Sequence, residues 1–163
     1  MPMDSAQIPG ADNESEPKGM LVLETTRFGR VQIDEKRIIH FPEGVLGFPD
    51  QKRFVILEHK PGSPFCWLQS VDSPDLAFVM MSPFLVKKDY LEDLPQSEKE
   101  IFQGEDAKDL VVFAFVTIPE GQVEKMTINL LGPILIDVKK RVGRQLVLAG
   151  SDYTTRHPVV SSK

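Results

Sequence analysis

The apolar residues of this chain fall into short runs that are separated by turn-forming residues. Between residues 20 and 148 these runs are rich in valine, isoleucine and phenylalanine, and most have the length of an ordinary β-strand. Glycine, proline, aspartate and serine lie between them, as expected for turns. The pattern predicts strands over residues 21–25, 31–33, 37–41, 53–58, 65–71, 76–81, 110–118, 126–131, 133–137 and 144–148.

Only residues 95–103 have the pattern of a helix. Pro95 suits its first turn, and Gly104 suits the position just past its end. Ile101 and Phe102 are expected to face inward while the charged residues before them face solvent. One short helix cannot supply the crossovers that a parallel sheet requires, so we expect a mainly antiparallel sheet.

Three of the predicted strands, over residues 54–57, 76–81 and 110–116, are continuously apolar. Such strands have both faces covered. With one helix available, loops, closure of the sheet or another protein must supply the cover. We therefore expect an all-β fold: a small, mainly antiparallel β-barrel-like domain with one short appended helix, with a two-sheet sandwich as the alternative. Trp67 and Phe115 are expected to lie in its core.

The stretch F-P-E-G-V-L-G-F-P over residues 41–49 sets aromatic and aliphatic side chains between two prolines and two glycines. Pro42 restricts the residue before it to extended conformations, and Gly44 suits the last position of a type I turn. Leaving this many apolar side chains in water would be costly. We expect a turn whose apolar side chains dock onto the core.

Length and composition indicate one domain, since 163 residues with 41% hydrophobic content can bury a single core. Residues 1–19 are polar and acidic and are expected to form a disordered tail. Residues 20–158 form the barrel-like domain, and residues 159–163 a flexible C-terminus. Neither a signal peptide nor a membrane-spanning run is apparent. Cys66 is the only cysteine, which favours a reducing cytoplasmic setting and an inert buried thiol.

Charge is unevenly placed along the chain, whose formal net charge is −5. Residues 89–109 carry eight acidic and two basic side chains, whereas a nucleic-acid-binding protein usually carries a basic stripe. The acidic segment therefore favours a basic partner, with a simply solvated acidic face as the alternative.

Catalytic and ligand-binding motifs give little signal. His40, His59 and His157 lie far apart in sequence, and none belongs to a metal-binding motif. The motifs for phosphate binding and for acyl transfer are likewise missing from the sequence. Asp72 and Asp75, in D-S-P-D, are expected to cap a tight turn. From its residues alone the chain is thus predicted to be a soluble, cytoplasmic all-β domain that binds a partner, with no metal and no cofactor expected.

Six blocks of sequence stand out together. They are the stretch over 41–49, W-L-Q-S-V-D-S-P-D-L-A-F (67–78), S-P-F (82–84), F-V-T-I-P-E (115–120), N-L-L-G-P-I-L-I (129–136) and Y-T-T-R-H-P (153–158). In this order they closely resemble the FliW family of flagellar assembly factors. The resemblance covers nearly everything from residue 21 to residue 158, and Asp137 stands where this family is expected to have asparagine.

The resemblance implies a non-enzymatic cytoplasmic protein that acts by partner switching. FliW-like proteins bind flagellin, and they also bind the translational repressor CsrA and relieve its repression of flagellin synthesis. Flagellin that accumulates occupies the FliW-like protein and leaves CsrA free, whereas flagellin export reverses the switch. We expect a monomer that binds these two proteins, does not insert into a membrane and does not bind nucleic acid directly.

Two surfaces are predicted for these partners. Flagellin is expected on an apolar surface that includes Phe48, Leu131 and Ile134, because Gly132 and Pro133 interrupt strand pairing beside it. CsrA is expected on an acidic surface, on or just beyond the helix, that attracts a basic protein. The acidic surface consists of Glu98, Glu100, Glu105 and Asp106.

A nucleic-acid-binding β-barrel is the main alternative. In that hypothesis Trp67 or Phe28 stacks on bases, and a basic hairpin contacts phosphates. The phosphate contacts would come from Arg30, Lys139, Lys140 and Arg141. A small-molecule-binding barrel or an enzyme is the third hypothesis, and no convergent polar cluster in the sequence supports it.

Overall fold

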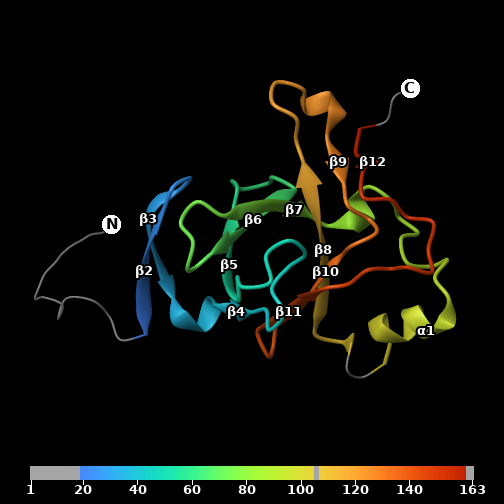
Figure 1. Ribbon diagram of the computed structural model, residues 1–163, viewed down its shortest axis with the longest axis horizontal. Helices are drawn as coiled ribbons and strands as arrows, with labels where there is room; N and C mark the ends of the chain where they lie inside the picture. The colour runs from blue at the N-terminus through green and yellow to red at the C-terminus, as the bar shows by residue number, and fades with distance from the viewer. Residues whose placement is uncertain (1–18, 105–106, 161–163) are drawn as a thin grey trace, which may run out of the picture.

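The strands of the main sheet close into a barrel (Figure 1). The computed structural model describes residues 19–104 and 107–160. In ring order the barrel contains β10, β11, β4, β5, β6, β7 and β8, and β8 pairs again with β10. All of these pairs are antiparallel except β11 with β4. The strands are β4 (Ile39–His40), β5 (Arg53–Glu58), β6 (Phe65–Ser70), β7 (Ala77–Met81), β8 (Leu110–Thr117), β10 (Ile134–Asp137) and β11 (Val142–Gln145). The predicted fold class, a mainly antiparallel β-barrel-like fold, is confirmed.

The barrel interior is one apolar cluster. Its buried side chains come from successive strands: Ile39, Phe54, Leu68, Met80 and Ile134. The loop over residues 41–48 adds Phe41 and Val45 to the same cluster. Gly143 leaves room for the Phe41 ring, because a Cβ there would lie 2.4 Å from Phe41 Cζ.

The turn predicted at residues 41–44 is confirmed. Gly44 N–H donates to the Phe41 carbonyl at 2.9 Å, and Gly44 has a φ of +67°. A Cβ at Gly44 would lie 2.3 Å from the Phe48 carbonyl oxygen, so only glycine fits. Phe41 and Val45 dock into the core as expected, whereas Leu46 and Phe48 remain exposed.

One part of the barrel's outer face is covered by a separate hairpin of β2 (Met20–Thr25) and β3 (Gly29–Asp34) (Figure 1, blue). Leu23 and Ile33 of this hairpin pack against Val55 and Leu57 of β5. The short helix η1 (Glu35–Arg37) then leads the chain into β4. This cover explains why β5 is apolar on both faces.

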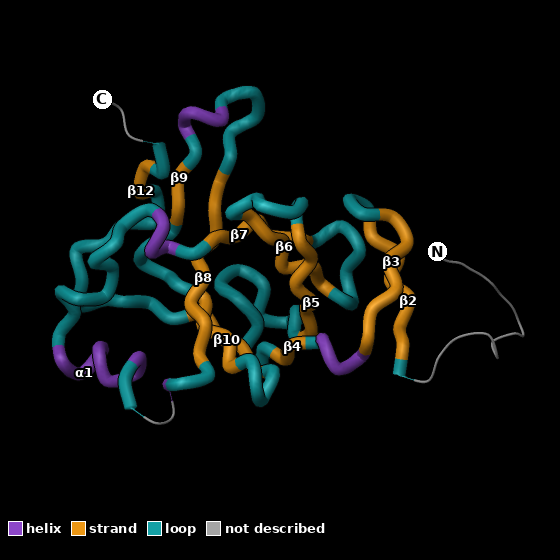
Figure 2. Tube along the Cα trace, turned by 180° about the vertical axis from the view of Figure 1, so that it is seen from behind, coloured by secondary structure: helices purple, strands orange, loops and turns teal. Residues whose placement is uncertain are grey.

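A second cover lies over β7 and β8. It contains η2 (Pro83–Leu85), α1 (Gln96–Lys99), η3 (Glu100–Phe102), β9 (Thr127–Ile128) and β12 (His157–Pro158) (Figure 2). The short helix η5 (Val123–Lys125), between β8 and β9, lies outside this cover, and Val123 is exposed. Tyr90 is buried here, and its hydroxyl donates to the Leu130 carbonyl at 2.6 Å. Tyr153 packs on Tyr90, and its hydroxyl accepts from Leu91 N–H at 2.8 Å. Chain segments without long helices thus cover the outer faces of β7 and β8.

Several predicted element boundaries were wrong. Residues 37–41 yield only the two-residue strand β4, because the chain first makes the 3-10 turn η1, which Asp34 caps. Residues 126–131 are strand only over β9, since Gly132 and Pro133 follow and the chain leaves the sheet. The strand predicted over 144–148 lies earlier, at β11. The helix predicted over 95–103 is confirmed as α1 followed by η3.

The predicted tail at residues 1–18 and the last residues, 161–163, lie outside the described part of the chain, so the predicted domain boundaries stay predictions. Among the described residues, no helix is long and apolar enough to cross a membrane.

Candidate protein-binding site

The barrel wall is open on one side of β8. On its other side β8 pairs with β10 over four consecutive residues, from Leu110 to Phe113. With β7 it pairs only at Met80↔Phe115 and Met81↔Ala114. Beyond this point residues 77–79 of β7 are in register with β6 alone, and residues 116–117 of β8 with β9 alone. The two strands therefore diverge.

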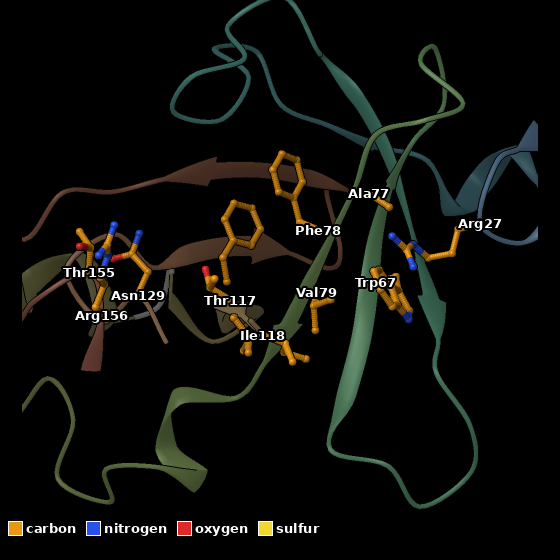
Figure 3. Close-up of a pocket in the computed structure, with 12 residues that line it drawn as sticks. Arg27, Trp67, Ala77, Phe78, Val79, Thr117, Ile118, Asn129, Thr155 and Arg156 are labelled. Atoms are coloured by element: carbon orange, nitrogen blue, oxygen red, sulfur yellow. The ribbon is translucent and has the colours of Figure 1, made fainter. Parts of the chain in front are cut away.

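A cleft of about 730 Å³ lies where β7 and β8 diverge (Figure 3). We call it the seam cleft. The barrel interior, the hairpin cover and the second cover all meet here, and each contributes a half-buried side chain: Phe78, Trp67 and Val79 respectively. Its size is in the range of ordinary binding sites.

Aromatic rings form the floor of the seam cleft. Phe78 and Phe115 are stacked, with ring centroids 4.5 Å apart and an interplanar angle of 13°. Phe48, from the 41–48 loop, meets Phe78 edge-on at 5.5 Å. Trp67 and Phe115, predicted to lie in the core, do pack against core clusters, but both are only half-buried and line this cleft. Their apolar neighbours in sequence gave no sign that the barrel wall opens beside them.

An arginine stands at each end of the seam cleft (Figure 3). The Arg27 guanidinium carbon lies 4.4 Å from the centre of the Trp67 ring, a cation–π contact. Arg156 lies at the opposite end, beside Asn129 and Thr155. Neither guanidinium has a carboxylate partner within residues 19–104 and 107–160, whereas Arg53 is paired with Asp72 at 2.6 Å.

The position of Arg27 is set by the turn over residues 70–76. Gln69 is 0% exposed, and its amide nitrogen donates to the carbonyls of Ser70 at 3.0 Å and Leu76 at 3.1 Å. The turn then holds the hairpin, because Thr26 N–H donates to the Pro74 carbonyl at 3.0 Å and the Thr26 hydroxyl donates to Asp75. A buried glutamine thus fixes the residue beside Arg27.

The two aspartates of this turn do not cap it as predicted. Asp72 binds Arg53, and that guanidinium holds the pKa of the Asp72 carboxyl below its usual value. Asp75 accepts from Thr26. The Ser70 hydroxyl caps the turn instead, accepting from Ser73 N–H at 2.9 Å. Its side chain is short enough to reach the amides that follow it.

The structure separates the residues predicted for flagellin. Ile134 is 0% exposed inside the barrel, so its place on a binding surface was wrong. It is in register with Phe113 and Gln145 and points into the core rather than lying at an irregular edge. Phe48 is 40% exposed, Leu46 beside it is 60% exposed, and Leu131 is half-buried.

The loop of Phe48 and the segment of Leu131 nevertheless lie next to each other. Gln145 connects them, since its side-chain oxygen accepts from Leu46 N–H at 2.8 Å and its nitrogen donates to the Gly132 carbonyl at 2.9 Å. We call the exposed residues Leu46 and Phe48, with Leu131, the loop surface. Phe48 also contacts Phe78, so the loop surface adjoins the seam cleft.

The acidic residues predicted for CsrA do not act as one set. Glu98 is half-buried and accepts from Gly150 N–H at 3.0 Å, which ties the helix to the C-terminal cover. This contact makes Glu98 a structural residue rather than part of a free acidic surface. Glu100 is exposed. Glu105 and Asp106 lie outside the described residues.

The groups invoked by the nucleic-acid alternative are partly occupied. Arg30 is paired with Glu24 at 2.9 Å. Arg141 donates to the Lys36 carbonyl at 2.9 Å. Trp67 lies beneath Arg27 and edge-on to Phe28, with ring centroids 5.6 Å apart. Two of the four basic residues of that hypothesis, and the Trp67 ring, are therefore already engaged in contacts within the protein.

The described residues offer little chemistry. Cys66 is half-buried rather than fully buried as predicted, and desolvation still raises the pKa of its thiol to about 11, which is in line with an inert thiol. Within residues 19–104 and 107–160, no three histidine, cysteine, aspartate or glutamate side chains gather as a metal site would require.

The architecture defined so far is a small closed β-barrel with two outer covers and a cleft in its wall. The family model described as FliW protein matches residues 22–159 of this chain. The flagellar assembly factor FliW of Geobacter sulfurreducens is 43% identical over 134 residues, which is 82% of this chain and 83% of that protein. The FliW of Bacillus subtilis is 41% identical over 139 residues, 85% of this chain and 96% of that protein.

A solved structure agrees with these relatives. The crystal structure of a flagellar assembly factor FliW matches with a TM-score of 0.75 and 34% identity, covering 88% of this chain and 99% of that one. The chain therefore belongs to the FliW family, as its sequence blocks indicated.

Sequence reasoning missed the seam cleft. Phe78 and Arg156 lie in two of the blocks that carry the family resemblance, and Arg27 lies in a predicted turn. These residues are far apart in sequence and are brought together only by barrel closure and by the covers. The one signal in the sequence was Arg156, a charged residue within the family-like block Y-T-T-R-H-P, which could have indicated a binding residue.

Proposed function

We propose that this chain couples flagellin synthesis to flagellin export by binding flagellin and CsrA in turn. Membership of the FliW family, whose named relatives are flagellar assembly factors, is the observation that carries this proposal. Binding of one partner releases the other, and the chain itself catalyses nothing. Both events take place in the cytoplasm, where flagellin is made.

Flagellin binds the loop surface. Leu46 and Phe48 are large apolar side chains held in water by a loop whose neighbours, Phe41 and Val45, are fixed in the core. A rigid loop loses little conformational freedom on binding, and exposed apolar side chains gain from burial. An apolar, amphipathic helix is the kind of partner that this surface suits.

The test is to titrate flagellin into the Leu46→Ala and Phe48→Ala proteins. Each variant should bind at least about tenfold more weakly, because a tenfold loss is about 1.4 kcal/mol and truncating an anchor side chain at the centre of an interface commonly costs about 2 kcal/mol or more. Val123→Ala is the matched control, because Val123 is also a large exposed aliphatic side chain but lies in η5. Unchanged affinity in both loop variants would remove flagellin from this surface.

CsrA binds the acidic side of the helix, where Glu100 is exposed and Glu105 and Asp106 follow in the sequence. Exposed charges of this kind mainly speed association with a basic protein and act less as salt is raised. Glu100→Lys should therefore lower the association rate with CsrA at low salt and leave flagellin binding unchanged. Equal rates for wild type and variant at every ionic strength would contradict this placement.

A further inference from the structure

We propose that the seam cleft binds an extended segment of a partner protein, one that carries a bulky apolar side chain between two carboxylates. This site adjoins the loop surface through the contact of Phe48 with Phe78, and it does not include the acidic helix. The chemistry of the segment follows from the residues of the cleft, whether flagellin, CsrA or another protein supplies it.

The two strand edges that border the cleft favour a ligand with an extended backbone. Residues 77–79 of β7 pair with β6 on one side. On their other side they do not pair with β8, which is in register with β7 only at Met80 and Met81. Thr117 of β8 is likewise in register with β9 only. Strand edges without a full partner are the usual place for a peptide to add as a strand. The cleft volume of about 730 Å³ lies between these two edges.

The floor of the cleft is apolar and favours an apolar side chain of the ligand. Phe78 and Phe115 are stacked and only half-buried, and Ile118 at the margin is 41% exposed. Burying such surfaces beneath a bulky side chain is favourable, at roughly 25 cal/mol per Å² of apolar area. Aromatic residues in a partly preformed pocket are typical anchors for a partner's side chain.

The two ends of the cleft are basic and favour carboxylate groups on the ligand. Arg27 and Arg156 stand at opposite ends of the cleft, and no aspartate or glutamate lines it. Neither arginine has a carboxylate partner among the described residues, in a chain whose net charge is −5. Guanidinium groups bind carboxylates through paired charge-assisted hydrogen bonds. An acidic segment therefore complements both ends.

A nucleic acid fits this arrangement less well. Base stacking needs an open aromatic face, and the Arg27 guanidinium lies over the Trp67 ring. The remaining rings, Phe78 and Phe115, are stacked on each other. Oligonucleotide binding is therefore an outcome that the test must detect, and it would count against the proposal.

The test begins with a random heptapeptide library displayed on phage and selected against the full chain. Selected peptides should be enriched in aspartate and glutamate on either side of a bulky apolar residue. Trp67 is the only tryptophan of the chain and lines the cleft, so its fluorescence reports occupancy directly. Synthetic copies of the selected peptides should change the Trp67 emission in a saturable way.

Charge reversal gives the decisive comparison. The Arg27→Glu, Arg156→Glu double variant should bind these peptides at least about tenfold more weakly. The Lys140→Glu, Arg144→Glu double variant, which makes the same charge change on two exposed residues outside the cleft, should bind normally. Both substituted cleft arginines are exposed, so circular dichroism should show unchanged folding. Two further peptides carry N-methyl groups on every second amide, one on the odd positions and one on the even positions. Only one of the two should lose binding, because a peptide strand added to a strand edge uses every second amide for hydrogen bonds to that edge.

Several outcomes would overturn the proposal. Selected peptides without acidic enrichment, or with normal affinity for the double variant, would remove the arginines from recognition. Peptides that bind without altering Trp67 emission would place binding elsewhere. Displacement by an oligothymidylate would make the cleft a nucleic-acid site. Peptide binding only after deletion of residues 1–18, or only to a dissociated dimer, would make the occupant this chain itself.

Discussion

Strand β8 is paired differently along its two edges. Along one edge it is in register with β10 from Leu110↔Asp137 to Phe113↔Ile134, and the barrel is sealed. Along the other it is in register with β7 for two residues only, and the seam cleft follows. The same strand therefore supplies both a closed seam and an open one.

The difference lies in which side chains meet across each seam. At the closed seam Ile134 and Ile136 are buried in the barrel interior together with Phe54 and Leu68. At the open seam the side chains are just as apolar, but Phe78 and Phe115 stay half-buried. Two arginines that have no carboxylate partner in the described part of the chain flank them. Apolar character alone thus does not separate a core from a binding site. Strand pairing and nearby charge do.

The largest expected effect is at the closed seam. Ile134→Ala should lower the free energy of unfolding by about 2 to 5 kcal/mol, because it removes a fully buried side chain and leaves a cavity. Val111→Ala, on the same seam but 37% exposed, should cost less than about 1 kcal/mol. Chemical denaturation measures both. A small loss for Ile134→Ala would mean that the seam is not closed as described.

The next effect is inside the barrel. Gly143→Ala should cost about 1 to 3 kcal/mol, because the new methyl group would lie against the Phe41 ring. The same substitution in a Phe41→Leu background should cost less, since the smaller side chain leaves space. Equal costs in both backgrounds, measured by denaturation, would show that the clash is not with Phe41.

The open seam should tolerate truncation better. Phe115→Ala should cost about 1 to 2 kcal/mol, below the 3 to 5 kcal/mol typical of a fully buried phenylalanine. The protein should remain folded and cooperative while its affinity for cleft-binding peptides falls. Thermal unfolding and peptide titration distinguish the two effects. Loss of cooperative folding would return Phe115 to the core.

The smallest expected effect is electrostatic. Arg53 lowers the pKa of Asp72, so the pair stabilises the fold above the ordinary carboxyl pKa of about 3.9 and loses this effect as pH falls through the lowered value. The side chains are 43% and 49% exposed, which limits the contribution to about 0.5 kcal/mol. Asp72→Asn should lose that amount at neutral pH and equal wild type in strong acid. A difference that persists in acid would have another cause.

The sequence indicated the architecture well because local signals and barrel closure agree. The strand over residues 53–58 and the Gly44 turn followed from apolar runs and turn residues. The position of Ile134 could not be predicted, because Gly132 and Pro133 suggested an irregular edge while pairing with both β8 and β11 holds that residue in the core. The seam cleft was hidden for a similar reason, since divergence of two strands has no sequence signature.

Hydrogen exchange of the full chain, with and without saturating flagellin, tests the proposed function most directly. Amides of residues 45–48 should exchange more slowly when flagellin is bound, whereas those of residues 134–137 should be protected in both states, because they lie in the closed seam. If flagellin binds but exchange over residues 45–48 is unchanged, flagellin does not bind the loop surface. If no flagellin binding is detected at all, the proposed function itself is contradicted.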